Sequence, residues 1–269
     1  MNDFFIANNN NFSFKHSIDE SPDQNLFSMH THSECEIYYF MSESGAFHIE
    51  GTTYPLSYGD ILIMDNAESH FIEIDPNKPY ERCSLLFKKD FIKSFDASGA
   101  LLLPFETRKP GKNNLYKNID FKNENYKIFL NNMMESSVNK ELSIISNITP
   151  LLYEIYKAFN MKTDIDTPVE ETRINQVIKY IMDNLEKPIS LDLICSKFYI
   201  SKPQLCRSFK SSTGTTVWNY ITIKRLIMAK NLMDSGILPS KAALASGFTD
   251  YSVFFKAYKK HFGFSPTSD

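Results

Sequence analysis

The feature that most constrains this chain is a pattern that occurs twice in its last third. Residues 191–214 and residues 242–263 each begin with a short helical pattern, break at a turn and continue as a second helix. This succession is typical of a helix-turn-helix. We therefore expect two helix-turn-helix units in tandem.

A longer helical pattern joins the two copies. Residues 216–235 carry apolar side chains at helical spacing, and Gly236 follows them as a candidate C-terminal cap. Twenty helical residues span roughly 30 Å, which is close to the pitch of B-DNA, about 34 Å. Two helices held that far apart on a stiff connector could enter successive major grooves on one face of a duplex.

Charge is distributed unevenly along the chain. Residues 1–169 contain 15 Lys and Arg against 24 Asp and Glu, a balance of −9, whereas residues 170–269 contain 14 against 8, a balance of +6. A surface that faces phosphates needs a positive balance of this kind. Lysines on a merely solvated face would give the same numbers, but the tandem pattern in the same residues favours nucleic-acid binding.

Residues 172–266 resemble the DNA-binding domain of AraC/XylS-type transcription regulators in the order and spacing of their residues. The positions that carry the resemblance are Ser190, Leu191, Ser201, Leu205, Arg207, Phe209, Lys210, Gly214, Arg225, Leu226, Ala229, Leu232, Ala243, Gly247, Phe248, Asp250, Phe254, Gly263, Ser265 and Pro266. The resemblance implies an all-α domain that binds double-stranded DNA, which we place at residues 171–269. It also implies a structural part for Arg225, which we leave out of the base-reading set.

The second helix of each copy should present one face to DNA. Ser201 and Asp250 are the candidate N-caps of these helices. Arg207 can pair with a guanine edge and Gln204 with adenine, whereas several lysines should contact phosphates. The expected base-reading residues are Lys202, Pro203, Gln204, Cys206, Arg207, Tyr251, Ser252, Phe255 and Lys256, and the expected phosphate contacts are Lys210, Lys259 and Lys260. For each of them the alternative is a solvated helix face.

Other features of the sequence argue against several classes of protein. No run approaches the ~18 apolar residues of a membrane span, and the first residues lack the layout of a secretion signal, so we expect a cytoplasmic protein. The four cysteines, Cys35, Cys83, Cys195 and Cys206, show no CxxC spacing. A disulfide framework or a cysteine zinc site is therefore not expected.

The first part of the chain has a different pattern. Short β-rich runs alternate there with turn signals, at residues 34–40, 46–50, 61–64, 70–74 and 84–87. Several short strands at regular spacing favour a closed antiparallel barrel or a double-sheet roll. The expected fold class is therefore α+β with two domains, in which residues 1–120 form a sensor barrel.

Four side chains of this barrel are candidates for a site. His30, His32 and Glu36 occupy even positions and so share one face of an extended segment, and His70 follows after a hairpin and a turn. The set resembles the two short motifs of the cupin fold, which supply His, His, Glu and His as ligands in metal-binding cupins. The residues before His70 depart from the second motif.

Three interpretations of this set are open. Regulators of the AraC type commonly use such residues to line a ligand cavity, and the expected pocket is then His30, His32, Glu36, Tyr38 and His70. The same polar groups could instead satisfy one another, or four of them could bind a divalent metal as His30, His32, Glu36 and His70. We expect a small-molecule effector and no cofactor, with a bound metal as the less favoured alternative.

Two helical patterns follow the barrel in residues 121–161. An apolar stripe of this kind does not by itself distinguish a core from an interface. The resemblance implies a homodimer that forms through helices in this position, and the expected interface is Leu142, Ile145, Leu152, Ile155 and Phe159. Residues 162–170 are polar, contain a proline and predict a linker.

The expected function is sequence-specific transcription regulation of the AraC type, modulated by a small molecule in the barrel. We expect an activator, while the resemblance leaves both activation and repression open. The resemblance makes a sugar the first guess for the effector and adds RNA polymerase as a further partner. One alternative is a constitutive DNA-binding regulator with an empty barrel. Another is a metal-dependent cupin enzyme, but this leaves the basic residues 170–269 unexplained, so we expect no enzyme.

Overall fold

The structure is a computed structural model of the 269-residue chain, and it describes residues 2–66, 68–135, 138–162 and 172–267. Contacts within the chain divide it into two compact units, Met1–Thr167 and Pro168–Asp269. Most of the predicted linker, residues 163–170, lies outside the described residues.

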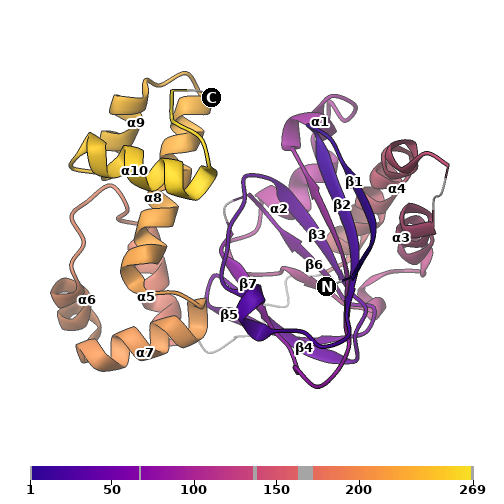
Figure 1. The fold of residues 1–269 in the computed structure, drawn as a ribbon, viewed down its shortest axis with the longest axis horizontal. Helices are drawn as coiled ribbons and strands as arrows, with labels where there is room; N and C mark the ends of the chain where they lie inside the picture. Colours follow the sequence, from indigo (N-terminus) through magenta and orange to yellow (C-terminus); the bar gives the residue numbers. More distant parts are fainter. Residues whose placement is uncertain (1, 67, 136–137, 163–171, 268–269) are drawn as a thin grey trace. The chain divides into compact units, whose positions relative to one another are not determined.

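Two antiparallel sheets form the first unit (Figure 1). The larger sheet has the strand order β1-β2-β8-β3-β6-β9, and the smaller has the order β5-β4-β7. The strands are β1 (Asn2–Asn8), β2 (Phe12–Asp19), β3 (Cys35–Phe40), β4 (Ser44–Ile49), β5 (Thr52–Ser57), β6 (Ile61–Met64), β7 (His70–Glu73), β8 (Tyr80–Phe87) and β9 (Leu115–Tyr116). The predicted β-rich runs fall in β3, β4, β6, β7 and β8, and the antiparallel double-sheet expectation is confirmed.

Strand β3 shows how the larger sheet is buried on both faces. All six residues of β3 are buried, and they alternate between two apolar clusters because successive side chains of a strand point to opposite faces. Ile37 and Tyr39 pack in a cluster that includes residues of the helices, whereas Tyr38 and Phe40 pack with residues of the smaller sheet. The even positions of β3 therefore face the space between the two sheets.

Helices cover the other face of the larger sheet. They are α1 (Lys89–Lys93), α2 (Leu103–Glu106), α3 (Asn125–Glu135) and α4 (Lys140–Met161), with three short 3-10 turns, η1 (Gln24–Phe27), η2 (Ala100–Leu102) and η3 (Asn118–Asp120). Helix α4 begins after Asn139, whose side chain accepts a hydrogen bond from the backbone N–H of Leu142, and it continues through Pro150. Helices α3 and α4 lie side by side (Figure 1).

The buried face of α4 corrects part of the predicted dimer interface. Leu152 and Ile155 are 0% exposed and belong to the core of this unit. They cannot contact a partner, so this part of the prediction is wrong. Phe159 packs partly buried against the same core. Leu142 and Ile145, by contrast, are 58% and 44% exposed.

The described residues of the second unit form six helices. They are α5 (Arg173–Met182), α6 (Leu191–Phe198), α7 (Lys202–Thr213), α8 (Val217–Asp234), α9 (Pro239–Ala245) and α10 (Tyr251–Phe262). Ser201 and Asp250 cap α7 and α10 as predicted, because their side chains accept hydrogen bonds from the backbone N–H groups of Gln204 and Val253, the third residue of each helix. Gly214 and Gly263 follow the same two helices in the left-handed conformation.

Helix α8 carries both helix-turn-helix units (Figure 1). Val217 and Tyr220, near its beginning, pack in the core of α5, α6 and α7, whereas Leu226 and Ala229 pack with α9 and α10. Gly236 follows α8 at a positive φ of 87°, which agrees with the predicted cap. The all-α tandem arrangement is confirmed. None of the described helices is both long enough and apolar enough to cross a membrane.

Candidate functional site

Helix α7 presents the predicted base-reading face of the first copy to solvent. Leu205 and Phe209 are fully buried and fix the rotation of the helix. The exposed residues are Lys202, Pro203, Gln204, Cys206, Arg207 and Lys210. Lys202 Nζ lies 2.7 Å from Asp192 Oδ1 of α6, so this lysine is already paired within the unit. Arg207 and Gln204 project from the open face of α7.

Helix α10 is arranged in the same way in the second copy. Phe254 and Tyr258 are fully buried, and the exposed predicted residues are Tyr251, Ser252, Lys256, Lys259 and Lys260. Phe255 is only half-buried, with its ring centroid 6.4 Å from that of Tyr251. The exposed face of α10 is therefore more aromatic than that of α7, and its lysines gather toward the end of the helix.

Arg225 joins the two copies inside the second unit. Its Nε and Nη2 donate to the backbone oxygens of Leu185 and Lys187, both at 2.8 Å. Gly247 lies against the same place with φ of +90°, and a Cβ there would stand 2.3 Å from Leu185 O. Glycine is needed at this turn because no side chain fits. Arg225 is thus engaged with the backbone, which agrees with its exclusion from the base-reading set.

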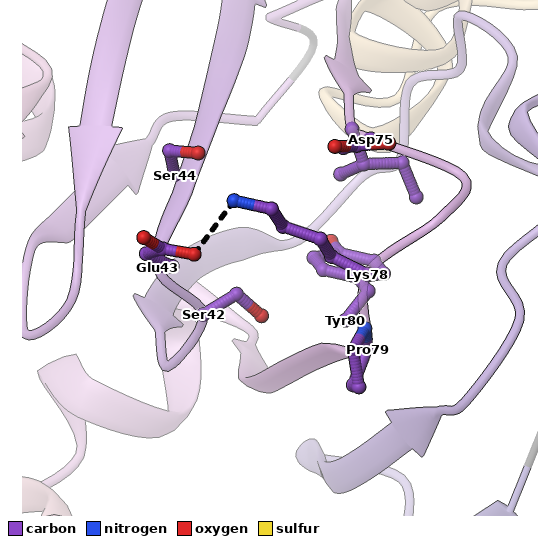
Figure 2. Close-up of a pocket in the computed structure, with 8 residues that line it drawn as sticks. Ser42, Glu43, Ser44, Asp75, Lys78, Pro79 and Tyr80 are labelled. Carbon is purple, nitrogen blue, oxygen red and sulfur yellow. Dashed lines mark hydrogen bonds and ion pairs between the residues drawn. The ribbon is translucent and has the colours of Figure 1, made fainter.

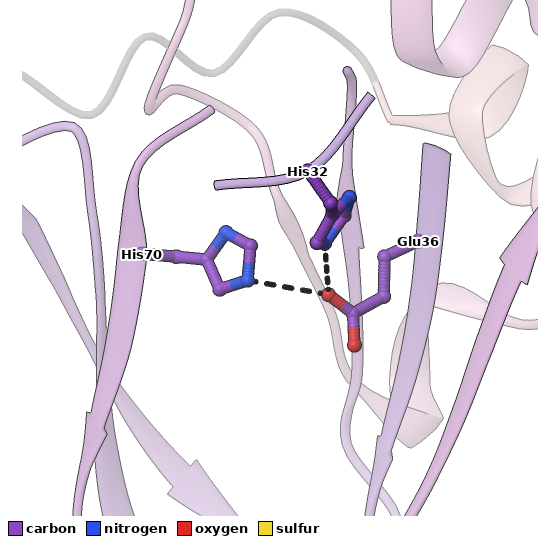
Figure 3. A group of neighbouring side chains, drawn as sticks. All are labelled: His32, Glu36 and His70. Carbon is purple, nitrogen blue, oxygen red and sulfur yellow. Dashed lines mark hydrogen bonds and ion pairs between the residues drawn. The ribbon is translucent and has the colours of Figure 1, made fainter. Parts of the chain in front are cut away.

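The structure brings three of the predicted sensor residues together (Figure 3). Glu36 Oε2 lies 2.9 Å from His32 Nε2 and 3.3 Å from His70 Nε2. Glu36 comes from β3, His70 begins β7, and His32 lies in the segment before β3. The three ligand-type atoms are within 4.8 Å of one another. Ser84 Oγ of β8 donates to the other carboxylate oxygen of Glu36 at 2.5 Å.

His30 stands apart from this group. Its backbone forms a bridge with that of His70, with both N···O distances 3.0 Å, and its ring centroid lies 4.3 Å from that of His70. The residue as a whole is nevertheless exposed, and it does not belong to the group of three. Among the residues that the structure describes, the predicted metal set of four is therefore reduced to three.

The electrostatics of the group keep Glu36 ionised. Burial alone would raise the pKa of this carboxyl, but the hydrogen bond with His32 and the charge of both imidazoles hold it well below its usual range. The Nδ1 atoms of His32 and His70 each lie 2.8 Å from a backbone oxygen, that of Glu34 and of Glu68 respectively. Two imidazoles and one carboxylate are a donor set that suits first-row divalent metals.

Tyr38 lies deeper between the sheets, beside residues that the sequence did not single out. Its hydroxyl contacts that of Tyr80 on β8. Arg82 is also buried, pairs with Asp19 Oδ2 at 2.8 Å and lies 4.3 Å from the centroid of the Tyr80 ring. Phe27 of η1 packs edge-on against Tyr80, with centroids 5.1 Å apart.

These missed residues share a face with the predicted ones. Register places Tyr38 opposite Ser84 on β8 and Phe40 opposite Arg82, and residues opposite one another in a sheet lie on the same face. Polar or aromatic residues alternate at positions 80, 82 and 84, and this pattern in the sequence could have predicted that they share a face. A hollow nearby is lined by Ser42, Glu43, Ser44, Ile74, Asp75, Lys78, Pro79 and Tyr80 (Figure 2), and its volume of about 10 Å³ holds roughly one water.

Comparison with known proteins places both units in one family. Residues 17–124 match an AraC-like ligand binding domain, and residues 194–268 match a helix-turn-helix domain. The HTH-type transcriptional activator RhaS of Escherichia fergusonii is 24% identical over 246 residues, which are 90% of this chain and 87% of that protein. The Msm operon regulatory protein of Streptococcus mutans serotype c is 24% identical over 271 residues, 98% of this chain and 94% of that protein.

A further relative has a higher identity over a shorter stretch. The probable transcription factor PqrA of Proteus vulgaris is 32% identical over 99 residues, 36% of this chain and 81% of that protein. These relatives are regulators of transcription by name. The chain belongs to the AraC family of transcription regulators, with a sensor domain of the AraC-like ligand-binding type followed by a DNA-binding domain of two helix-turn-helix units.

Proposed function

We propose that α7 and α10 read bases in two successive major grooves, and that a small molecule in the sensor domain controls this binding. The observation that carries the proposal is the shared support on α8. Each reading helix has its own N-cap and its own buried residues, which fix the face that it buries. Each exposes its predicted DNA-facing side chains, apart from the half-buried Phe255. Helix α8 has 18 residues, or roughly 27 Å.

Specific roles follow from side-chain geometry. Arg207 pairs with guanine and Gln204 with adenine, while Tyr251 and the half-buried Phe255 contact thymine methyls. Lys210, Lys259 and Lys260 contact phosphates, which fixes position and does not specify sequence. Selection of binding sites from a random duplex library tests this assignment. We expect two conserved blocks one helical turn apart, and enrichment of a single block, or of none, would contradict it.

The effector that we propose is a sugar in the space between the two sheets. Buried charged groups (Asp19, Arg82, Glu36) lie there beside the aromatic rings of Tyr80 and Tyr38. Such a lining suits a polyhydroxyl ligand, because charged groups hydrogen-bond hydroxyls and aromatic faces cover C–H surfaces. Since the nearby hollow holds roughly one water, binding must displace a covering segment, and η1 with Phe27 is that segment.

Melting curves of the full chain with a panel of sugars test the effector assignment. A sugar that binds only the folded state raises the midpoint temperature of thermal unfolding of the sensor domain by mass action. A binder should also require Arg82, so Arg82→Met should abolish the shift. If no sugar shifts the midpoint and site selection still succeeds, the constitutive regulator is the correct reading.

We further propose that the chain forms a homodimer through the open face of α4 and contacts RNA polymerase as an activator. Leu142 and Ile145 are the predicted residues that this face retains, and Tyr153 joins them at 52% exposure. Leu142, Ile145 and Tyr153 lie three and eight residues apart, close to helical repeats. Sedimentation velocity over a range of concentrations tests the dimer, and a monomer at every concentration would refute it.

A further inference from the structure

We propose that the sensor domain binds one divalent first-row transition-metal ion between His32 Nε2, Glu36 Oε2 and His70 Nε2. The ion would share Glu36 with the proposed sugar site, but its binding needs no organic effector. The hydrogen bonds of the two imidazole rings fix which ring nitrogens carry protons. A backbone carbonyl only accepts hydrogen bonds, so a ring nitrogen that bonds to one must carry the proton.

The ring of His32 leaves a lone pair toward Glu36. Its Nδ1 lies 2.8 Å from the backbone oxygen of Glu34 and therefore donates. In the neutral ring Nε2 is then an acceptor, yet it lies 2.9 Å from Oε2 of Glu36, which is also an acceptor. Two acceptors at this distance need a proton or a cation between them.

The ring of His70 repeats the arrangement and removes the simpler solution. Its Nδ1 lies 2.8 Å from the backbone oxygen of Glu68, and its Nε2 lies 3.3 Å from the same Oε2 of Glu36. This Nε2 is buried and has no hydrogen-bond partner among the residues that the structure describes. A proton on His32 would serve only its own contact, and a second proton on His70 would place two imidazolium cations against one buried carboxylate. A single divalent cation would instead serve all three atoms.

The distances and the surrounding contacts fit such an ion. Ligand atoms bound at about 2.1 Å to one metal lie roughly 3 to 3.4 Å apart. The two contacts of Glu36, at 2.9 Å and 3.3 Å, match this spacing, and the two imidazole nitrogens, which lie within 4.8 Å of each other, would move closer on binding. Metal-binding histidines usually donate their other ring N–H to a carbonyl or carboxylate, as both rings do here. Ser84 Oγ, which donates to Glu36 Oε1 at 2.5 Å, orients the carboxylate in the same way.

The nature of the ligands selects the metal. Two neutral imidazoles and one carboxylate suit ions such as Zn²⁺, Mn²⁺, Co²⁺ or Ni²⁺, whereas Mg²⁺ and Ca²⁺ prefer oxygen ligands alone. Three protein ligands leave at least one coordination position for water. The ion would tie the segment before β3 to β3 and β7, because each supplies one ligand.

The test is metal binding by the untagged full chain after dialysis against a chelator. We expect titration calorimetry with Zn²⁺ to give one equivalent per chain, and Co²⁺ to give a visible d–d spectrum. The midpoint of the sensor transition should rise by about 5 °C or more at saturating Zn²⁺. Binding of less than a tenth of an equivalent of every metal tried would overturn the proposal.

Substitutions test whether these three residues hold the bound Zn²⁺ ion. His32→Ala and Glu36→Gln should each weaken Zn²⁺ binding by at least about 100-fold, since each removes a direct ligand. The matched control is His48→Ala, because His48 Nε2 pairs with Glu73 Oε2 at 3.2 Å in the same domain without a third ligand. Far-UV circular dichroism at 20 °C checks that each variant is folded.

The same variants show which results would overturn the proposed site. If His32→Ala and Glu36→Gln each still bind one equivalent of Zn²⁺ with unchanged affinity, the ion lies elsewhere in the chain and the assignment is overturned. Loss of binding in His48→Ala to the same degree would overturn it as well. His32 is the preferred first substitution because it is only half-buried, so its replacement disturbs the core less than replacement of His70.

Discussion

A buried ion pair gives the largest effect that we predict for a single substitution in the sensor domain. Arg108 and Glu68 have side chains that are only 2% and 4% exposed. Nη1 of Arg108 donates to Glu68 Oε1 at 2.7 Å, and the same oxygen accepts a hydrogen bond from the backbone N–H of Gly111 at 2.7 Å. Burial alone would raise the pKa of Glu68, but these donors lower it, so the carboxylate is charged.

Arg108→Ala removes the cation and leaves that charge in the interior. Breaking a buried pair from one side costs about 3–5 kcal/mol, because the remaining charge is neither solvated nor paired. For a unit of this size each kcal/mol shifts the midpoint by about 2–4 °C, so we expect a fall of roughly 6–20 °C. The double variant Glu68→Gln/Arg108→Met removes both charges and should recover most of the loss.

The assay separates the two units through their chromophores. Trp218 is the single tryptophan and lies in α8, so its fluorescence follows the DNA-binding domain while far-UV circular dichroism follows both. The matched control is Glu43→Ala, because Lys78 Nζ and Glu43 Oε2 are 2.7 Å apart but largely exposed (Figure 2). The control should leave the midpoint unchanged. If Arg108→Ala melts like the control, the reasoning from burial fails.

Three further predictions concern DNA binding, the dimer and the second turn. Arg207→Ala should weaken binding to the specific DNA site by about 1–3 kcal/mol and reduce the base preference at one position of that site. Lys260→Ala should weaken binding to all DNA sequences alike and lower the slope of log affinity against log salt concentration by about 1. Fluorescence anisotropy measures both, and a uniform loss of affinity in both variants would contradict these roles. Leu152→Ala should destabilise the sensor by about 2–5 kcal/mol, whereas Leu142→Glu should leave its stability within about 0.5 kcal/mol and produce monomers in sedimentation; the reverse result would invert core and interface. Gly247→Ala should lower the tryptophan-detected midpoint, because its Cβ would stand 2.3 Å from Leu185 O and its φ is positive; an unchanged midpoint would show that the turn can relax.

The DNA-binding domain could be predicted closely because its signals are local. A serine or aspartate before a helix can accept a backbone hydrogen bond within three residues, and Ser201 and Asp250 do so. Leu205 and Phe209, four apart, fix which face of α7 is buried. Each cap is complete within one helix and its flanking turn, so the sequence alone specifies it. Leu205 and Phe209 pack with residues of α5, α6 and α8, and here the two caps and the spacing together predicted the buried face.

The interface on α4 could not be predicted from its periodicity. Leu142 and Leu152 belong to the same apolar pattern, yet one is 58% exposed and the other 0%. The difference depends on what packs against each position of α4, because Leu152 belongs to the core cluster of the unit and Leu142 does not. That is a property of tertiary packing, which a helical stripe does not contain.

The pair of Glu68 and Arg108 was missed for a related reason. The two residues are separated by 40 positions, and neither belongs to a recognisable motif. Their contact forms because the segment after α2 folds back on the turn between β6 and β7. The group of His32, Glu36 and His70 was easier to predict, because His32 and Glu36 are four residues apart in the sequence. Only the position of His70 depends on the tertiary fold.

Glu68 connects this pair to the proposed metal site. Its carboxylate binds Arg108, and its backbone oxygen accepts the Nδ1 proton of His70 at 2.8 Å. Removal of Arg108 should therefore disturb the carbonyl that sets the tautomer and the direction of the His70 ring. Loss of such an outer contact usually weakens a metal site by about 10–100-fold.

We accordingly expect Arg108→Ala to weaken Zn²⁺ binding by about that factor at 10 °C, where the variant is still folded, while Glu43→Ala leaves binding unchanged. Glu68→Gln/Arg108→Met should recover Zn²⁺ affinity together with stability, because without a buried charge the turn that carries Glu68 can keep its place. Recovery of stability without recovery of affinity would mean that the charge on Glu68 itself, and not the position of its backbone, controls His70.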